Sequence, residues 1–576
     1  MTTTTLTKYP QKTKTYAKPI RPGIIVAIAA TIAAVAATLY YLRAGDITAY
    51  GDAESHLNIA KRVIDSLTPG LAQLGGIWLP LPHLLLVPFV HFDILWRTGL
   101  AGSIVSGTCF VVSAVFIYKL THLVTKSVLA GMVSAAVFIA NPNILYMQST
   151  PMTELTLIVF FVLSTYYFVR FLHERSRVVY LISAAFFGLC ASLSRYDGWA
   201  LVLAEAGVIA LMYLPDVIDW KKAMRGNKGA LMPAQAIPIQ DAEPVVNEKG
   251  WAALEGRLIL FSTLAFIGIF LWLAWGWLIL GDPLYFSHSE FSAKSQQNSW
   301  LARGELPAYH HISVALQYYA ATVASNLGLI LVATSLAGLF LFFADKKMRN
   351  KFFIAFILFV PFIFNVATLY LGQSVIFIPS LTPSSYEWNL FNVRYGVMMV
   401  PAAAFFIGYL FYILKGKSKT IVSYAGPGAL MALIPLQAFM FASGASPVIT
   451  LEDGRYGLSS IIAKPSEIQT WFDTHYDGGM VLSDDYSRSI SIIRSPVPMQ
   501  DVIYVGNKPY WDDSLIAPEK YATWIVIQAH DSLWQAIWEN PTTQARLFKY
   551  FNKVYTSENF LIFKRINNAT STPTTS

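Results

Sequence analysis

The sequence predicts an α-helical polytopic membrane protein with a small α/β domain after its last membrane span. Three observations support this fold class. The chain of 576 residues is 55% hydrophobic and only 13% charged. Its apolar residues gather in many long runs, and these runs stop near residue 443. A soluble protein has roughly 25% charged residues, so this composition indicates a membrane protein.

The apolar runs predict about eleven transmembrane helices, because one helix needs about 20 apolar residues to cross a bilayer. Their approximate bounds are residues 24–42, 99–118, 128–146, 155–172, 179–194, 199–214, 258–280, 316–343, 352–372, 395–414 and 421–443. The proline-rich segment 78–90 is too short for an ordinary span, and we expect it to be re-entrant or interfacial. The first run is longer than the hydrophobic region of a signal peptide, so no cleavable signal is expected.

Lys and Arg residues predict the orientation, since positive residues favour the cytoplasmic side. They are concentrated in loops that share a side with the N-terminus. We therefore expect a multi-pass protein of the cell membrane whose tail 1–23 and loop 215–257 are cytoplasmic. The first outer loop, 43–98, and everything after residue 443 are then extracytoplasmic. The net charge of +8 lies mostly in these short loops and does not indicate nucleic-acid binding.

Residues 444–566 have the composition of a separate domain. The segment 466–476 has helical apolar spacing. Segments 478–485, 523–528 and 558–565 are short apolar runs beside turn residues, which predicts strands. We expect an extracytoplasmic α/β domain here. The tails 1–23 and 567–576 are polar and of low complexity, and we expect both to be disordered.

Polar residues from distant parts of the chain arrive on the outer side of this predicted topology. The first outer loop brings an acidic and histidine cluster, and later groups lie at the edges of spans. They are Asp52, Glu54 and His56; Glu154; Arg195, Tyr196 and Asp197; the loop 281–298; and Arg394 and Tyr395. Charges at the rim of the hydrocarbon are costly and usually mark a site or pathway.

Structural roles remain open for each of these groups. Asp52 could cap the helix that follows it, and Glu154 could be a first-turn acid of its span. Arg195 and Asp197 could form a purely structural pair. Arg394 could extend to lipid headgroups, although an arginine beside Tyr395 is also a good phosphate ligand.

Several motifs are absent from the sequence. It contains no GxxxxGK[ST] phosphate loop, no HExxH, no CxxC and no GxSxG. These absences argue against a P-loop ATPase, a zinc protease of the HExxH type and a serine hydrolase of the nucleophile-elbow type. The pair Asp484-Asp485 is a weak metal signal, and a turn is expected there.

The stretch "GDAESHLNIAKRVIDSLTPGLAQLGGIWLPLPHLL" resembles the first outer loop of GT-C membrane glycosyltransferases. It is similar to the protein O-mannosyltransferase and aminoarabinose transferase group (glycosyltransferase family 39-like), whose members typically have adjacent acids here. The elements "STPMTE", "SRYDGW" and "RYGVMMVP" are similar to later parts of the same fold. This chain has an extra residue between Asp52 and Glu54. Both acids are therefore candidates for the catalytic position, and we favour Asp52.

The resemblance implies an inverting glycosyltransferase with a polyprenyl-phosphate sugar donor and an acceptor hydroxyl on a protein, lipid or glycan. Asp52 would be the general base, Arg394 and then Arg195 would stabilise the leaving phosphate, and His56 and Glu154 would position the substrates. Tyr196, Asp197 and Tyr395 would complete the binding site. No cofactor is implied with certainty, and a divalent cation stays open.

Two other function classes are compatible with the sequence. A polytopic transporter or lipid-linked sugar flippase would place polar groups near the middle of the membrane and often shows an internal repeat. A receptor or assembly protein would use the outer domain to bind a partner. The sequence has no convincing internal repeat, and its polar groups lie at span ends, which favours the enzyme.

Overall fold

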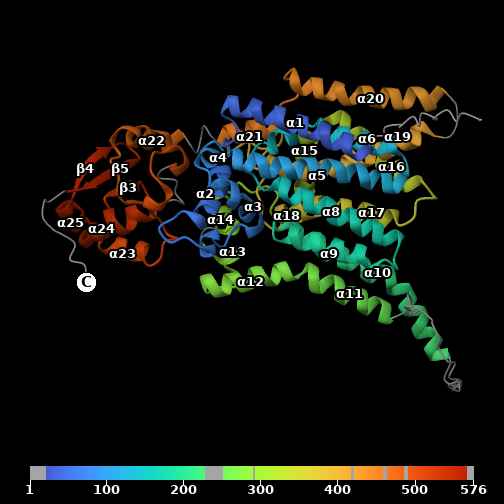
Figure 1. Cartoon of the computed structure of the whole chain (residues 1–576), viewed down its shortest axis with the longest axis horizontal. Helices are drawn as coiled ribbons and strands as arrows, with labels where there is room; N and C mark the ends of the chain where they lie inside the picture. The colour runs from blue at the N-terminus through green and yellow to red at the C-terminus, as the bar shows by residue number, and fades with distance from the viewer. Residues whose placement is uncertain are drawn as a thin grey trace, which may run out of the picture.

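The computed structural model describes residues 21–226, 251–289, 292–416, 421–457, 463–484 and 491–566. These residues form a long helical bundle that continues at one end into a small α/β domain (Figure 1). The predicted α-helical polytopic fold with a C-terminal α/β domain is thus confirmed. The predicted disordered tails, apart from residues 21–23, and residues 227–250 of the predicted loop 215–257 lie outside the described residues.

Six helices in the described part of the chain are long and apolar enough to cross a membrane, or nine if each of three bent pairs is one span. The single helices are α1 (Pro22–Ala44), α5 (Leu100–Thr125), α8 (Glu154–His173), α10 (Asp197–Gly226), η2 with α19 (Val393–Met399 and Val400–Lys415) and α20 (Ile421–Ala442). The bent pairs are α11 with α12 (Trp251–Ala265 and Ile267–Leu280), α15 with α16 (Ile312–Leu327 and Leu329–Ala344) and α17 with α18 (Lys351–Leu358 and Val360–Tyr370).

The two remaining predicted spans, 128–146 and 179–194, correspond to shorter apolar helices. The first is α6 (Val128–Ile139), which is followed by α7 (Pro142–Met147). The second is α9 (Val178–Ser192). Each of the other nine predicted spans corresponds to one long helix or one bent pair.

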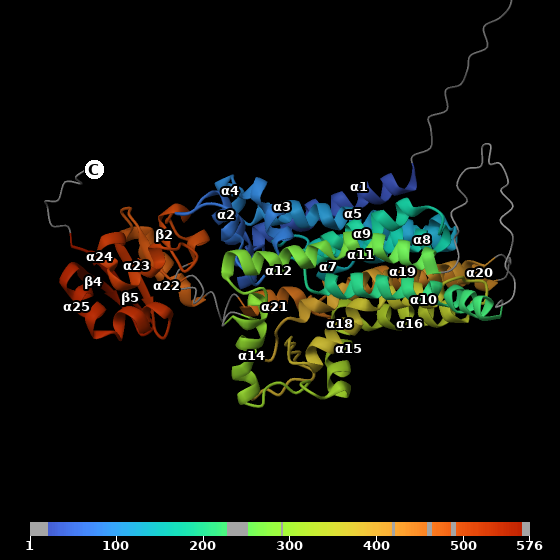
Figure 2. The ribbon, with the colours of Figure 1, turned by 90° about the horizontal axis from the view of Figure 1, so that it is seen from below.

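Both α1 and α20 run toward the end of the bundle that carries the C-terminal domain, which we call the domain end (Figures 1 and 2). Only 17% of the apolar window of α1 is buried, so most of this helix faces outward, as a lipid-facing helix does. Its last residue is followed by Gly45 at φ 77°, a left-handed conformation that glycine adopts without strain.

The predicted first outer loop forms short helices at the domain end (Figure 1). They are α2 (Gly51–Ile64), η1 (Leu71–Leu74), α3 (Pro80–Val90) and α4 (Asp93–Arg97). The apolar residues Ala53, Leu57 and Ala60 of α2 are fully buried. This face follows the 3.6-residue period and packs α2 against α3.

A sharp break between α15 and α16 positions the start of η2. The two helices meet at 109°, at Gly328. The Asn326 carbonyl accepts hydrogen bonds from the side chains of Asn141 at 2.9 Å and Asn143 at 3.0 Å. The Asn326 amide donates to the Val393 carbonyl at 2.7 Å. The side-chain amides of Asn141 and Asn143 thus satisfy a backbone carbonyl that the helix break leaves unpaired. The Asn326 side-chain amide in turn fixes Val393, the residue before Arg394.

The C-terminal domain is built on a five-stranded sheet of order β2-β1-β3-β5-β4. Its strands are β1 (Val481–Ser483), β2 (Val502–Ile503), β3 (Trp524–Gln528), β4 (Phe551–Thr556) and β5 (Phe560–Arg565). β1 is parallel to β2 and β3, whereas β5 is antiparallel to β3 and β4. The three predicted strands correspond to β1, β3 and β5. Sequence reasoning missed β2 and β4, of which β2 is only two residues long.

Helices cover this sheet and connect it to the bundle. The domain contains α22 (Ala463–His475), η4 (Ile492–Arg494), η5 (Met499–Asp501), α23 (Tyr510–Ile516), α24 (Pro518–Tyr521), η6 (Trp534–Trp538) and α25 (Pro541–Tyr550). The preceding helix, α21 (Ile449–Gly457), falls inside the predicted domain range 444–566 but packs against α7 and η2. Its position brings a polar segment of the C-terminal part to the domain end of the bundle.

The C-terminal domain contacts the first outer loop through polar groups. The Arg97 guanidinium donates to the carbonyl oxygens of Ile493 at 3.3 Å and Ser495 at 2.7 Å. The Asn507 amide donates to the Thr68 hydroxyl at 2.9 Å. Contacts of this kind fix the orientation of the domain on the loop, because each pairs a group from one part with a group from the other.

Candidate active site

Arg394 stands at the centre of the polar cluster at the domain end of the bundle. Its Nη2 atom donates to Asp52 Oδ2 at 2.7 Å, and its Nε atom donates to Glu154 Oε1 at 3.2 Å. The Arg394 side chain is 7% exposed and that of Glu154 is fully buried. A buried guanidinium thus joins two of the acids that the sequence places at distant span edges.

Arg195 extends the same cluster on the other side of Glu154. Its Nη1 atom donates to Glu154 Oε1 at 3.1 Å, and its Nε atom lies 3.4 Å from Asp197 Oδ2. Asp197 in turn accepts from the Asn365 amide at 3.4 Å. The charges therefore alternate in the order Asp52, Arg394, Glu154, Arg195, Asp197, an arrangement that lets each charge oppose its neighbours.

The acids of this chain lie at the beginnings of helices. Asp52 is the second residue of α2, Glu154 is the first residue of α8 and Asp197 is the first residue of α10. Negative side chains are stabilised there by the helix dipole. The N-cap of α2 is Tyr50, whose side chain makes no capping hydrogen bond. Asp52 is thus a first-turn acid paired with Arg394 rather than a capping residue.

Two tyrosines flank the guanidinium groups. The Arg394 guanidinium carbon lies 4.9 Å from the centre of the Tyr50 ring and 5.3 Å from that of Tyr395. The Arg195 guanidinium lies 5.0 Å from the Tyr395 ring. Aromatic faces attract cations, so these rings limit where each guanidinium can lie. Tyr395 therefore lies between the two arginines of the cluster.

Asp453 of α21 joins the cluster from the C-terminal part and was missed by sequence reasoning. The Tyr50 hydroxyl lies 3.2 Å from Asp453 Oδ2 and 2.6 Å from the Thr450 carbonyl oxygen. Burial raises the pKa of the Asp453 carboxyl to about 6, while the Arg394 charge and the Tyr50 hydrogen bond oppose the rise. The segment "LEDG" that contains it follows the last predicted span, so no pattern in the sequence indicated a position in the bundle.

Glu54 points to the C-terminal domain instead of Arg394. Its Oε1 atom accepts from Arg494 Nε at 2.5 Å, and its Oε2 atom accepts from the Ser491 hydroxyl at 2.7 Å. Arg494 also donates to the Thr48 carbonyl at 3.2 Å. The two acids of the first outer loop are thus separated by their partners. Asp52 faces the arginine cluster, and Glu54 faces η4.

His56 and Tyr196 have partners outside the alternating chain of charges. The His56 ring contacts His83 of α3, with 2.9 Å between Nδ1 and Nε2. The Tyr196 hydroxyl donates to the Ile77 carbonyl at 2.7 Å, and its ring stacks on Phe286 at a centroid distance of 5.1 Å. Tyr196 therefore links the start of α10 to the first outer loop and to the segment 281–298.

Within that segment, Asp282 and His288 lie 2.9 Å apart and form an exposed pair. Residues 290–291 of the same segment lie outside the described residues. In the C-terminal domain, Asp484 accepts from the Ser532 hydroxyl at 2.6 Å, and residue 485 lies outside the described ranges. The Asp484 contact joins the end of β1 to the residues after β3, and the turn expected at Asp484-Asp485 extends outside the described residues.

Glu154 retains one oxygen without a partner. Its Oε2 atom is buried and has no hydrogen bond to any described residue. A buried carboxylate oxygen without a donor is costly, so this atom is suited to receive a hydroxyl or another donor from a ligand. Among the described residues, no three or more His, Cys, Asp or Glu side chains are grouped so that they could hold a metal ion.

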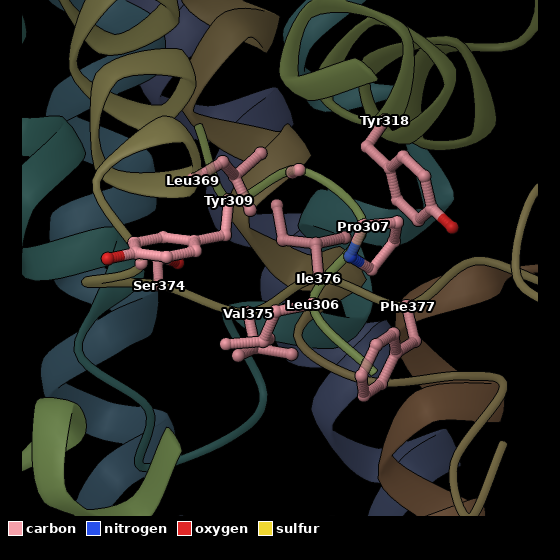
Figure 3. Close-up of a pocket in the computed structure, with 11 residues that line it drawn as sticks. Leu306, Pro307, Tyr309, Tyr318, Leu369, Ser374, Val375, Ile376 and Phe377 are labelled. Atoms are coloured by element: carbon pink, nitrogen blue, oxygen red, sulfur yellow. The ribbon is translucent and has the colours of Figure 1, made fainter. Parts of the chain in front are cut away.

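A small, mostly apolar pocket is separate from the polar cluster. Figure 3 shows its lining, which comes from the segments 306–309 and 374–377 and includes Tyr318 of α15 and Leu369 of α18. None of the predicted site residues lines it. It borders η2 through Asn392, whose side chain donates to the Val375 carbonyl at 3.0 Å.

Comparison with known proteins agrees with this architecture. Residues 90–222 match the family model of dolichyl-phosphate-mannose-protein mannosyltransferases. No curated protein matches the chain. The crystal structure of ArnT from Cupriavidus metallidurans bound to undecaprenyl phosphate is similar, with a TM-score of 0.51 at 11% identity, over 94% of this chain and 99% of that chain.

A second solved structure is similar to a lower degree. The apo oligosaccharyltransferase of Archaeoglobus fulgidus has a TM-score of 0.44 at 12% identity, over 95% of this chain and 75% of that chain. The likeness to ArnT gives the fold: this is a multi-pass membrane protein with the fold of the GT-C glycosyltransferases. The resemblance seen in the sequence is therefore confirmed at the level of the fold.

Proposed function

We propose that this protein transfers a sugar from a polyprenyl-phosphate donor to an acceptor hydroxyl at the outer face of the membrane, with inversion at the anomeric carbon. The main supporting observation is that the buried Arg394 guanidinium donates hydrogen bonds to both Asp52 and Glu154. The reaction needs a cation for a departing phosphate beside a carboxylate that can take a proton, and this site supplies both. ArnT, which shares the fold, binds a polyprenyl phosphate.

Donor binding would free the base. The Arg394 guanidinium is paired with the Asp52 carboxylate at 2.7 Å. A phosphate that arrives at Arg394 competes with this carboxylate, because the guanidinium N–H groups donate to phosphate oxygens as they do to carboxylate oxygens. Asp52 then loses its cation and becomes a stronger base at the moment when the sugar is in place. This exchange couples the binding of the donor to the activation of the acceptor.

Asp52 is the best placed of the acids to act as the base. Its side chain is 32% exposed, whereas that of Glu154 is fully buried between two arginines. Glu54 is held by Arg494 and Ser491 of the C-terminal domain. Only an acid that acceptor and water can reach can receive the hydroxyl proton and release it afterwards. The base therefore removes the acceptor proton as the oxygen attacks the anomeric carbon.

The other groups would serve the leaving phosphate. The bond from the anomeric carbon to the phosphate oxygen breaks, and the phosphate leaves as an anion that needs no protonating acid. Arg394 and Arg195 supply two positive charges to it, and Glu154 keeps both guanidinium groups in place. A divalent cation that arrives with the phosphate is compatible with this scheme and can be tested by chelation.

The transporter or flippase alternative would place polar groups along a path through the membrane. Here Asp52, Glu154 and Asp197 lie in the first turns of α2, α8 and α10 and are joined by the two arginines. Helix α2 lies at the domain end of the bundle (Figure 1). This placement favours a site at one face of the membrane.

Mass analysis of cell-surface glycans and glycoproteins tests the proposed function for any sugar that the protein transfers. Cells that lack the protein should lose one defined glycan mass. The wild-type protein should restore it, and the Asp52→Asn variant should not, at equal abundance in the membrane. An unchanged glycan profile on deletion would count against a transferase.

A further inference from the structure

A buried pair of histidines lies between α2 and α3. His56 Nδ1 is 2.9 Å from His83 Nε2, and His83 Nδ1 is 3.1 Å from the Leu79 carbonyl oxygen. The residues are 2% and 0% exposed. The Trp78 ring packs on His56 with 4.7 Å between ring centroids. Nothing in the apolar sequence "WLPLPHLLL" indicated that His83 has a polar partner.

These contacts determine which nitrogens carry protons. The Leu79 carbonyl can only accept, so His83 Nδ1 must be the donor. Neutral His83 then has a lone pair on Nε2, and the His56 Nδ1–H group donates to it. A doubly protonated His83 would reverse this direction, but a charge at a fully buried site has a high desolvation cost. The pair thus leaves His56 with a proton on Nδ1 and a lone pair on Nε2.

The second nitrogen of His56 is directed away from His83, because the two ring nitrogens of an imidazole point in different directions. His56 follows Asp52 by four residues on α2, so the two side chains share a helix face. Burial lowers the pKa of His56 well below its ordinary value, and the nearby His83, Arg394 and Arg195 lower it further. His56 is therefore neutral near pH 7 and lies within the electrostatic influence of both site arginines.

We propose that His83 is a positioning residue that fixes His56 in the Nδ1–H tautomer, so that His56 Nε2 accepts a hydrogen bond from a substrate hydroxyl. The substrate part of this inference rests on the proposed function, whereas the tautomer does not. The hydroxyl belongs either to the donor sugar or to the acceptor. The tautomer matters because a protonated Nε2 would present a donor where the site needs an acceptor.

The first test is ¹⁵N NMR of the histidine rings in the full-length protein, labelled and reconstituted in lipid nanodiscs without substrate. The spectrum of a His56→Gln variant identifies the His56 signals. We expect a protonated Nδ1 and an unprotonated Nε2. A protonated Nε2 in the wild-type protein overturns the proposal, whatever reaction the protein catalyses.

Two substitutions at residue 83 separate the tautomer from packing. His83→Gln keeps an acceptor for His56, so the tautomer should persist and kcat/KM should stay within several-fold of wild type. His83→Arg offers only donors, because a guanidinium keeps its proton and has no acceptor, so the His56 proton should move to Nε2 and kcat/KM should fall about 10- to 100-fold. If the arginine variant does not fold, His83→Leu removes the acceptor without adding a charge, and both tautomers should appear.

Steady-state kinetics then identify the hydroxyl. A rise in KM for the polyprenyl-phosphate sugar in the His83→Arg variant assigns the contact to the donor sugar. A rise in KM for the acceptor, or a fall in kcat alone, assigns it to the attacking hydroxyl. If the arginine and glutamine variants have equal kinetic constants although only the arginine variant has the changed tautomer, His56 Nε2 accepts no substrate hydroxyl.

Discussion

The Arg394 guanidinium and the Asp52 carboxylate meet at 2.7 Å although 342 positions separate them in the chain. Asp52 comes from the short helices that follow α1, and Arg394 comes from η2, at the start of the span that continues as α19. Their contact forms the end of the polar cluster that solvent can reach, because the Asp52 side chain is partly exposed. In the proposed reaction this contact breaks when the donor phosphate binds. The rate of transfer should therefore depend on the planar shape of the Arg394 guanidinium as well as on its charge.

Arg394→Lys tests the shape of this guanidinium. A lysine keeps the positive charge but cannot bind Asp52 and Glu154 through two separate nitrogens in one plane. We expect transfer to fall about 10²- to 10³-fold, as it does when an oxyanion-stabilising group is removed. The measurement is the initial rate of transfer in proteoliposomes. Arg303→Lys, at an exposed ion pair with Glu305, is the matched control and should retain full activity.

Glu154→Gln tests whether the ion pairs of Glu154 with Arg195 and Arg394 stabilise the folded protein. The buried carboxylate is the shared partner of Arg195 and Arg394, so its loss leaves buried positive charge uncompensated. Removal of one partner of a buried ion pair typically costs about 3–5 kcal/mol of folding free energy. A clear fall in the melting temperature of the detergent-purified variant is expected. An unchanged melting temperature together with full activity would contradict the role given to Glu154.

Glu54→Gln and Arg494→Ala test the attachment of the C-terminal domain. Glu54 binds Arg494 and Ser491, and these contacts join α2 to η4. Both variants should show faster hydrogen exchange in residues 491–501 and in α2, because the domain is then held less firmly. The expected loss of transfer is smaller than that of Asp52→Asn. Unaltered exchange in both variants would mean that the pair does not hold the domain.

Asp453 gives the stability of the protein a dependence on pH. Its folded pKa of about 6 lies above the ordinary value of 3.8, because burial disfavours the charged carboxylate. Below the ordinary value both states are protonated at this group. Between pH 3.8 and pH 6 the unfolded chain has released this proton while the folded protein still holds it. The free energy of unfolding therefore falls by at most about 1.4 kcal/mol per pH unit in this range.

Asp453→Asn should remove this dependence. The melting temperature of the wild-type protein relative to the variant should therefore fall between pH 5 and pH 6, and the difference should level off above that range. The measurement is a set of thermal melts of both proteins in the same detergent. Parallel curves across this pH range would contradict the raised pKa of Asp453.

The bundle, the α/β domain and most of the cluster could be predicted from the sequence for a simple physical reason. Membrane spans are recognisable by their length and apolarity, and a charge at a span edge is costly enough to indicate a role. Asp52, Glu154, Arg195 and Arg394 were therefore conspicuous. The bend between α15 and α16 was not, because the apolar run 316–343 continues across it and only Asn326 and Gly328 mark the break.

The partners of each acid could not be predicted in the same way. Asp52 and Glu54 are equivalent candidates in the sequence, and their difference arises from Arg494, which lies 440 positions from Glu54. Asp453 follows the last span in a polar segment, so it resembled part of the outer domain. His83 lies in an apolar helix, where its partner His56 is visible only once α2 and α3 are packed together.

Single-turnover transfer by Asp52→Asn and Glu54→Gln, side by side in proteoliposomes loaded with the polyprenyl-phosphate sugar donor, tests the central claim most directly. Asparagine keeps the size of Asp52 but cannot accept the proton, so the rate should fall about 10²- to 10⁴-fold while donor binding persists. Glu54→Gln should retain most of the rate. Normal transfer by Asp52→Asn, with the loss found in Glu54→Gln instead, would contradict the assignment of Asp52 as the base.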